Sequence, residues 1–332
     1  MIFYRGLKLL KMALSYRDFV CNEHFDVRLD RWLRRQFFQE LRQGEIERAV
    51  RGGFIRVNGK RAKSSMRVSS GCKISIEIHL SQQWEAQKPA KTQTVSQQHR
   101  DAFETLLLRN FCDFCVINKP AGLDVQGGRG INASVDHFLR AVSDEYRLVH
   151  RLDRETSGAL IVAKTLEMAI YLTQLFREHK VQKTYRAIVL GRLTPPSGKI
   201  CAPLLKRDSG GGGSDTCCGW SVVVDEIRGK PAETVYRTIR CVNAGELVWS
   251  DVELFPRTGR KHQLRVHMAH IGTPIAGDSK YGVGGGIANQ QIFGESGRSR
   301  KVMLLHSHSI KFKNKDGKLF SIEVPLPDYW PC

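Results

Sequence analysis

The sequence predicts an α+β protein in which a mixed, largely antiparallel sheet with flanking helices follows a small α+β domain. Two observations carry this prediction. Short apolar stretches separated by turn residues are typical of strands, and other stretches have the three- and four-residue spacing of helices. In addition, a chain of 332 residues that is 41% hydrophobic is long enough for one large and one small domain with packed cores.

The charge of the chain indicates a polyanionic partner. Lysine and arginine number 52 against 33 aspartate and glutamate, which gives a formal net charge of +19. Such a surplus attracts polyanions, of which nucleic acid is the commonest. A solvated basic surface without a partner is the alternative, but a surplus of this size favours nucleic acid. The charge is uneven, since residues 1–80 hold 17 basic and 8 acidic residues.

Composition divides the chain into four parts. Residues 1–25 form an N-terminal extension, whose first part is short, basic and apolar, so that a weak signal or transit segment stays an alternative. Residues 26–80 form the small domain. Residues 81–104 contain six Gln and no regular apolar period, which predicts a flexible polar linker. Residues 105–330 alternate strand-like and helix-like stretches and form the large domain.

The small domain combines predicted helices, strands and a basic surface. Apolar residues have helical spacing over 29–37 and 46–50. Strands are expected at 54–57 and 74–78, and Asn58-Gly59 after the first of them indicates a tight turn. Basic residues on the first helix and around this turn are expected to contact phosphate. These residues are Arg31, Arg34, Arg35, Arg51, Arg56, Lys60 and Arg61.

Cysteine and histidine usage predicts neither a metal site nor an oxidising compartment. The nine cysteines are odd in number and irregular in spacing, which favours free thiols in a reducing compartment. Cys112 and Cys115 form a CxxC that lacks a second pair at zinc-ribbon spacing, and no carboxylate completes a ligand set with the five histidines between 262 and 308. No apolar run approaches the ~20 residues that span a bilayer, so no membrane segment is expected.

The most informative string for chemistry is HRLDRETSG at residues 150–158, directly before a strand-like stretch. Asp153 lies between Arg151 and Arg154, and nearby cations are expected to lower its pKa and keep it ionised. A positioned carboxylate of this kind can act as a nucleophile or a base. The alternative is a salt-bridged surface turn, which this string alone does not exclude.

Three further strings place polar residues at the ends of predicted strands. Residues 257–267, RTGRKHQLRVH, gather basic groups, and residues 182–187, QKTYRA, supply the phenol of Tyr185. Residues 118–123, NKPAGL, end the first strand of the large domain in a turn. The basic groups of residues 257–267 are expected to converge near one place.

In this order, the four strings resemble the RluA-type pseudouridine synthases, and GDSKYG at 277–282 and LLHS at 304–307 continue the likeness. Residues 26–80 resemble the S4 RNA-binding domain, through RLDRWL at 28–33 and GGFIRVNGK at 52–60. The combination is similar to the RluC-like and RluD-like enzymes of large-subunit (23S) ribosomal RNA, and the glycine-rich residues 127–130 favour the RluC-like type. The resemblance implies the pseudouridine synthase fold and isomerisation of RNA uridines without metal or cofactor.

The resemblance also assigns roles to residues of this chain. Asp153 is the catalytic aspartate, Tyr185 packs on the target base and takes part in proton transfer, and Arg265 pairs with Asp153. Arg151 helps to extrude the uridine or holds RNA near the site. The expected substrate-binding set is Arg151, His150, Leu152, Thr156, Lys119, His262 and Gln263. At position 126 the chain has Gln where relatives often have His, which questions RNA detail rather than chemistry.

Two other functions stay open at this point. One is a non-catalytic S4-domain protein that binds RNA or assists ribosome assembly, and the other is a pseudouridine synthase that acts on another RNA, such as tRNA. The expected partner is RNA, and the family expectation is a monomer. The expected compartment is the cytoplasm of a bacterium, or an organellar matrix if the chain is eukaryotic.

Overall fold

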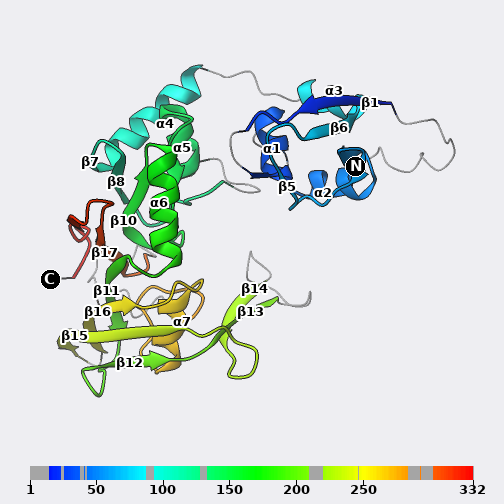
Figure 1. The fold of residues 1–332 in the computed structure, drawn as a ribbon. Coiled ribbons are helices and arrows are strands. Elements are labelled where there is room, and N and C mark those ends of the chain that lie inside the picture. Colours follow the sequence, from blue (N-terminus) through cyan, green and yellow to red (C-terminus); the bar gives the residue numbers. More distant parts are fainter. Residues whose placement is uncertain are drawn as a thin grey trace. The chain divides into compact units, whose positions relative to one another are not determined.

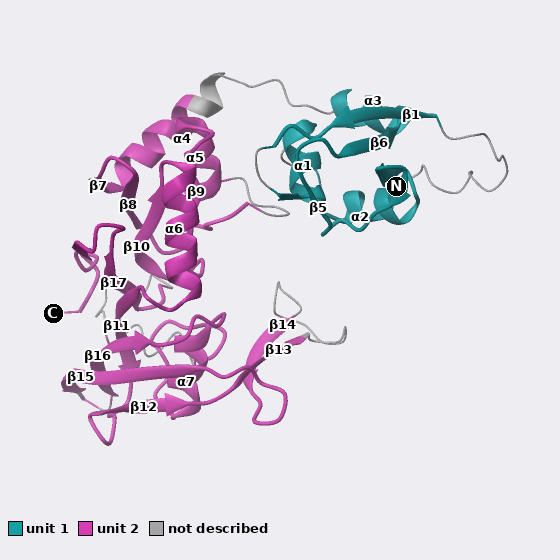
Figure 2. Cartoon of the chain, viewed as in Figure 1, with its two compact units in different colours: residues 1–92 teal, residues 93–332 magenta. Residues whose placement is uncertain are grey.

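The computed structural model of the chain describes residues 15–23, 26–37, 41, 43–86, 93–127, 133–208, 220–245, 247–282, 292 and 302–331. The chain forms two compact units, residues 1–92 and residues 93–332 (Figure 2). Among the described residues, no helix has both the length and the apolar character needed to cross a membrane.

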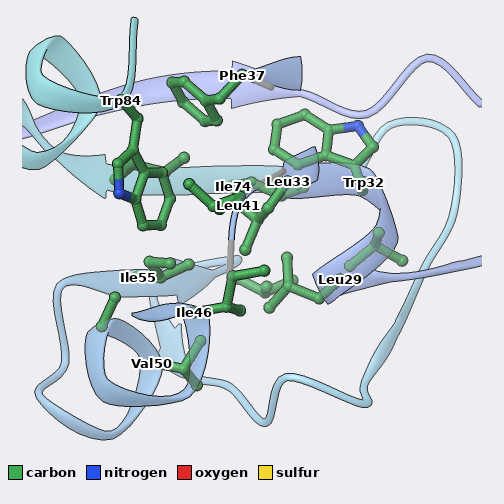
Figure 3. Close-up of a cluster of buried hydrophobic side chains, with 14 of the residues drawn as sticks. Leu29, Trp32, Leu33, Phe37, Leu41, Ile46, Val50, Ile55, Ile74 and Trp84 are labelled. Atoms are coloured by element: carbon green, nitrogen blue, oxygen red, sulfur yellow. The ribbon is translucent and has the colours of Figure 1, made fainter. Parts of the chain in front are cut away.

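The first unit is a small α+β domain built on a four-stranded antiparallel sheet, in the order β1-β6-β3-β4. Its elements are β1 (Tyr16–Val20), β2 (Val27–Arg28), α1 (Leu29–Gln36), α2 (Gln43–Arg51), β3 (Ile55–Val57), β4 (Lys60–Arg61), β5 (Arg67–Val68), β6 (Lys73–Glu77) and α3 (Ile78–Ala86). Leu29, Leu33 and Ile46 from the helices meet Ile74 from the sheet in one buried core (Figure 3). The predicted turn joins β3 to β4 with positive φ at both Asn58 and Gly59.

Two predicted boundaries of this unit were wrong. β1 pairs with β6 along its whole length, so residues 16–20 belong to the small domain and not to an extension. Because β1 lies at the edge of the sheet and buries little, its sequence lacks a strong apolar alternation. Ile78, which was expected to end the last strand, begins α3, because the Glu77 carboxylate accepts the backbone N–H groups of His79 and Leu80.

The predicted flexible linker of residues 81–104 was also wrong where the structure describes it. α3 continues through residue 86, and α4 (Gln93–Leu106) belongs to the second unit. Each helix is held by a large aromatic residue: Trp84 packs on Phe37 with ring centroids 5.3 Å apart, and Phe103 is buried. A few buried residues among many glutamines do not produce a periodic apolar pattern, so the sequence suggested a linker.

The second unit contains a ten-stranded sheet, in which β12-β15-β16-β11-β17-β10-β8-β7 form the main order and β18 and β9 pair with β17 and β10. Only β10 and β17 run parallel among its described pairs, which confirms the predicted mixed, largely antiparallel sheet. The elements after α4 are β7 (Leu107–Asn110), β8 (Phe114–Lys119), α5 (Val135–Val142), β9 (Arg147–Leu148), β10 (Ser157–Ala163), α6 (Leu166–Arg177), β11 (Gln182–Leu190), β12 (Ser197–Cys201), β13 (Leu204–Asp208), β14 (Trp220–Val224), β15 (Glu233–Ala244), β16 (Leu247–Pro256), α7 (Gln263–His270), β17 (Leu305–Lys313) and β18 (Leu319–Glu323).

Strand β10 is an interior strand of this sheet, between β17 and β8. All seven of its residues are buried, because α6 packs on one face, while α4 and α5 cover the other face of the same part of the sheet (Figure 1). Gly158 has φ +103°, and a Cβ there would lie 2.4 Å from the Ser307 backbone oxygen of β17. Glycine therefore permits the close approach of β10 to β17 directly beside the loop that carries Asp153.

Candidate active site

A pocket of about 540 Å³ opens where five segments meet. They are the loop before β10, the start of β11, the segment that leads from the end of β16 into α7, the end of α6 with the turn after it, and the first residue of β17. Nine of the ten residues that the sequence singled out for catalysis or substrate binding line this pocket. They are His150, Arg151, Leu152, Asp153, Thr156, Tyr185, His262, Gln263 and Arg265.

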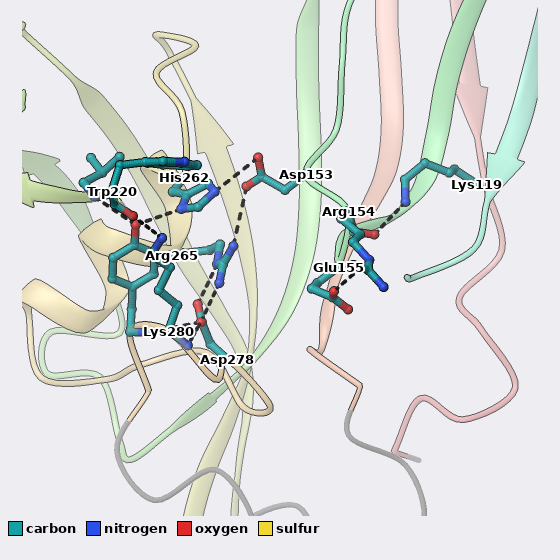
Figure 4. Close-up of polar contacts among 11 residues, drawn as sticks. Lys119, Asp153, Arg154, Glu155, Trp220, His262, Arg265, Asp278 and Lys280 are labelled. Carbon is teal, nitrogen blue, oxygen red and sulfur yellow. Dashed lines mark hydrogen bonds and ion pairs between the residues drawn. The ribbon is translucent and has the colours of Figure 1, made fainter. Parts of the chain in front are cut away.

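Asp153 reaches this pocket with a side chain that is only 19% exposed. Its carboxylate lies 3.8 Å from His262 Nε2 and 4.0 Å from Arg265 Nη1 (Figure 4). Burial raises the pKa of Asp153, although the charges of Arg265 and Arg151 act to lower it. The expectation of a lowered pKa was therefore wrong, because the carboxylate loses more from leaving water than it gains from its cations.

Arg265 makes its hydrogen bonds to Asp278 rather than to Asp153. Its Nε and Nη2 donate to the two Asp278 oxygens at 2.7 Å each, and Asp278 also accepts the backbone N–H of Tyr281. Although burial acts to raise it, the hydrogen bonds from Arg265 lower the pKa of Asp278. Only Nη1 faces Asp153, so the expected ion pair between Arg265 and Asp153 is longer than a hydrogen bond, and Arg265 shares its charge between Asp153 and Asp278. The sequence showed Asp278 within GDSKYG but gave no signal of its role.

His262 lies at the start of α7 with φ 53° and is held by Tyr281. Val222 N–H donates to the Tyr281 oxygen at 3.1 Å, and that oxygen lies 2.7 Å from His262 Nδ1. Because the Tyr281 oxygen already accepts the Val222 N–H, its O–H is available to donate to His262 Nδ1. We therefore assign the ring proton to Nε2, which faces Asp153. Burial lowers the pKa of His262 to about 3, so the ring is neutral.

Tyr185 projects from β11 into the pocket beside an apolar wall. Leu152, Leu264 and Leu305 line the same space. Burial raises the pKa of Tyr185 to about 12, so its phenol keeps its proton at neutral pH. A flat ring against aliphatic side chains can hold a planar base, whereas the polar groups of the pocket lie around Asp153.

Lys119 lies outside the pocket, so its predicted contact with substrate was wrong. Its side chain is fully buried, and Nζ donates to the backbone oxygens of Pro120, Leu123 and Arg154 at 2.8 to 2.9 Å. Burial lowers its pKa to about 8. Lys119 thus ties the turn after β8 to the loop that carries Asp153.

Two other predicted residues line the pocket, but their polar atoms are engaged in hydrogen bonds within the protein. His150 stacks on Phe176 with ring centroids 4.4 Å apart, and its Nε2 accepts the Ile161 N–H of β10. The Gln263 side-chain oxygen accepts from the Thr258 hydroxyl and the Arg260 N–H. Both residues therefore fix the loops that form the walls.

Sequence reasoning missed several pocket residues. Phe176, Arg177 and His179 come from the end of α6, which no motif marked. Lys183 lies in the string around Tyr185, and burial lowers its pKa. These residues lie apart from the Asp153 loop in the sequence, so no motif indicated that they line the same pocket. The fold brings them together because β11 pairs with β17, and β17 pairs with β10.

The basic residues predicted for the first unit divide into two groups. Arg34 donates to the Leu41 backbone oxygen and Arg56 donates to the Tyr16 hydroxyl, so these two support the fold, whereas Arg35 is exposed and forms a surface ion pair with Glu23. The other four are exposed. These are Arg31, Arg51, Lys60 and Arg61. In the described parts of the chain, no group of three or more His, Cys, Asp or Glu residues has the arrangement needed to hold a metal ion.

Comparison with known proteins identifies the class of enzyme to which this fold and pocket belong. Residues 113–270 match the RNA pseudouridylate synthase family, and residues 27–73 match the S4 domain. The chain is 35% identical over 315 residues to "Ribosomal large subunit pseudouridine synthase C" of Rickettsia bellii, which covers 91% of this chain and 95% of the relative. A Salmonella typhi protein of the same name is 34% identical over 304 residues, which is 90% of this chain and 89% of the relative.

Two solved structures resemble a large part of the chain. Human RNA Pseudouridylate Synthase Domain Containing 4 has a TM-score of 0.55 at 26% identity and covers 70% of this chain and 94% of its own. Human RNA Pseudouridylate Synthase Domain Containing 1 has a TM-score of 0.52 at 28% identity, with 68% and 87% covered. The chain belongs to the RNA pseudouridine synthase family, RluA type. It is an RNA pseudouridine synthase that carries an S4 domain, as the sequence predicted.

Proposed function

We propose that this enzyme converts specific uridines of large-subunit ribosomal RNA to pseudouridine, with Asp153 as the catalytic carboxylate. One observation carries the catalytic assignment: among the described residues, Asp153 is the only Asp or Glu that lines the pocket. It is surrounded there by basic side chains, those of Arg151, Lys261 and Arg265 among them. A single buried carboxylate among cations is suited to reaction with one bound group rather than to surface pairing.

The reaction breaks the N1–C1′ bond of uridine and forms a C5–C1′ bond, while a proton leaves C5 and N1 gains one. No redox change is involved. The ionised Asp153 attacks C1′, attacks the base or removes the 2′ proton, and these three routes share the same requirement for a free carboxylate. The detached uracil must stay in place while it turns. Tyr185 and the Leu152, Leu264 and Leu305 wall offer an apolar surface for that purpose.

Arg151 and the exposed basic residues of the first unit are proposed to bind RNA. Arg151 is exposed at the pocket, where a cation can hold a phosphate while the target base leaves its stack. Arg31, Arg51, Lys60 and Arg61 are exposed on a domain of the S4 family. Their proposed role is affinity for RNA and not chemistry, because the catalytic carboxylate lies in the other unit.

The ribosomal substrate is proposed from the names of relatives that match nearly the whole chain. On this basis the enzyme acts in the compartment that holds its ribosomes, which is the cytoplasm in a bacterium or the matrix in an organelle. We also propose a monomer that needs no metal or cofactor for the isomerisation.

The test is pseudouridine mapping of total RNA from cells with and without the gene, followed by restoration with wild type or Asp153→Asn. The proposal expects a small set of large-subunit sites to disappear and to return only with wild type. Loss of tRNA sites instead would replace the proposed substrate. Sites that return with Asp153→Asn would remove Asp153 from the chemistry.

A further inference from the structure

Trp220 is the centre of a basic cluster that the known reaction does not explain. It begins β14, and three lysine ammonium groups lie around its indole ring. Lys261 Nζ is 3.5 Å from the ring centroid, Lys280 Nζ is 4.2 Å from it, and Lys206 Nζ is 5.4 Å from it. These lysines come from three separate segments, so the fold assembles the cluster.

In the described parts of the chain, the ammonium groups of the two nearest lysines form no ion pair with a carboxylate. The ion pairs there join neither Lys261 nor Lys280 to a carboxylate. Lys280 instead donates to the Trp220 backbone oxygen at 2.6 Å, which fixes its position. Burial and the charges of Arg151, Lys206 and Lys280 act against the charge on Lys261 and lower its pKa. An anion bound between these ammonium groups would relieve their repulsion.

The cluster lies next to the catalytic carboxylate. The Trp220 and His262 rings have centroids 5.1 Å apart, and the far nitrogen of His262 is 3.8 Å from Asp153 (Figure 4). Lys261 also lines the pocket together with Asp153. The His262 imidazole therefore lies between the Trp220 ring and the Asp153 carboxylate. This spacing suits a phosphate on the target ribose or on the next one.

We propose that Lys261 and Lys280, held on the Trp220 ring, bind an RNA phosphate adjoining the target uridine. The proposal rests on the proposed function, because it uses Asp153 to place the uridine. Lysine ammonium groups suit a phosphate, since they bind it as compact charges without a fixed geometry. The indole stabilises both cations and keeps them in place before RNA arrives. Binding there offsets part of the cost of extruding the target base.

The first experiment measures RNA affinity without turnover. Full-length wild type and the Lys261→Gln/Lys280→Gln variant are titrated with decauridylate over a range of salt concentrations. Loss of one phosphate contact is expected to weaken binding about tenfold and to reduce the slope of log affinity against log salt by about 0.7. The matched control is Lys318→Gln, an exposed lysine near Lys313 at the end of β17 far from the pocket. An unchanged slope in the double variant, or an equal loss in the control, overturns the proposal.

The second experiment locates the phosphate. An RNA fragment that contains a mapped target uridine is made with one neutral methylphosphonate linkage at each flanking position in turn. In wild type, one position is expected to raise KM about tenfold, and in the double variant the same change costs less than twofold, because the contact is already lost. Equal penalties in both proteins at every position overturn the subsite. If wild type forms no product from any RNA, the proposed function fails, whereas the affinity experiment still decides the subsite.

Discussion

Two buried Arg–Asp pairs in the second unit have similar geometry and different surroundings. Arg186 on β11 donates to both Asp251 oxygens at 3.1 and 2.5 Å, and neither residue lines the pocket. Arg265 donates to both Asp278 oxygens in the same manner, but its third nitrogen faces Asp153. The comparison shows that a bidentate pair can join two strands of a sheet or hold one guanidinium nitrogen toward a third group, here the carboxylate that we propose to be catalytic.

The largest effect is expected from Asp153→Asn. Asp153 is the proposed catalytic carboxylate, so its replacement by an amide should lower kcat by at least about a thousandfold. Product formation on a target RNA measures this. The matched control is Glu155→Gln, a carboxylate two residues along that pairs with Arg154 and lies outside the pocket lining. Activity of Asp153→Asn within tenfold of wild type would show that the pocket carboxylate is not catalytic.

The same variant has an expected effect on stability with a definite sign. Burial raises the pKa of Asp153 in the folded protein above that of the unfolded chain, so its ionised form opposes folding at neutral pH. The unfavourable contribution of Asp153 to the stability of wild type therefore disappears as the pH falls through this raised pKa. Asp153→Asn should be at least as stable as wild type at pH 7, and its advantage should shrink in acid. Denaturant unfolding at several pH values measures both.

The second effect comes from breaking each buried pair. Asp251→Asn leaves the largely buried Arg186 without the carboxylate that it bonds, and it should cost about 3–5 kcal/mol of unfolding free energy. Asp278→Asn should cost less, because Arg265 can turn to the neighbouring Asp153 carboxylate. Only Asp278→Asn should also alter kcat, because it frees Arg265 to bind Asp153 directly. The measurements are denaturant unfolding and turnover by the folded fraction. Equal changes in kcat would mean that the pair at the pocket has no special part in catalysis.

The third effect tests the role of His262 separately from that of Arg265. Tyr281 contacts both residues, since the Arg265 guanidinium lies 5.1 Å from its ring centroid and its hydroxyl bonds to His262. Tyr281→Phe keeps the ring and removes the hydroxyl, so the His262 proton is no longer fixed on Nε2. A loss of about tenfold in kcat is expected. Tyr236→Phe, which removes a buried hydroxyl bonded to the Pro195 oxygen, is the control and should not change kcat.

Most of the fold, and most of the residues that line the pocket, could be predicted from the sequence because they depend on local patterns. The run of buried residues in β10, the Asn58-Gly59 turn and the strings around Asp153 and Arg265 are each continuous in the chain. The errors concern properties that depend on the folded structure, namely the burial of a charged group and the partners that it finds there. Desolvation reverses the expected pKa shift of Asp153, and the topology gives Lys119 three backbone oxygens inside the protein. The strings did not show which groups satisfy a buried charge, since one of the three partners of Lys119 is the Arg154 oxygen, 35 residues away in the chain.

The smallest effect is a displacement of the pH profile. In wild type, kcat/KM should fall as the pH falls through the raised pKa of Asp153, because the reaction needs the ionised carboxylate. His262 should not contribute to this limb, since its pKa is about 3. Asp278→Asn removes a negative charge that raises the pKa of Asp153 and releases Arg265, which lowers it. The acid limb of this variant should therefore move to lower pH, whereas Asp251→Asn should leave it in place. A limb that stays fixed in both variants would mean that Arg265 and Asp278 do not control the ionisation of Asp153.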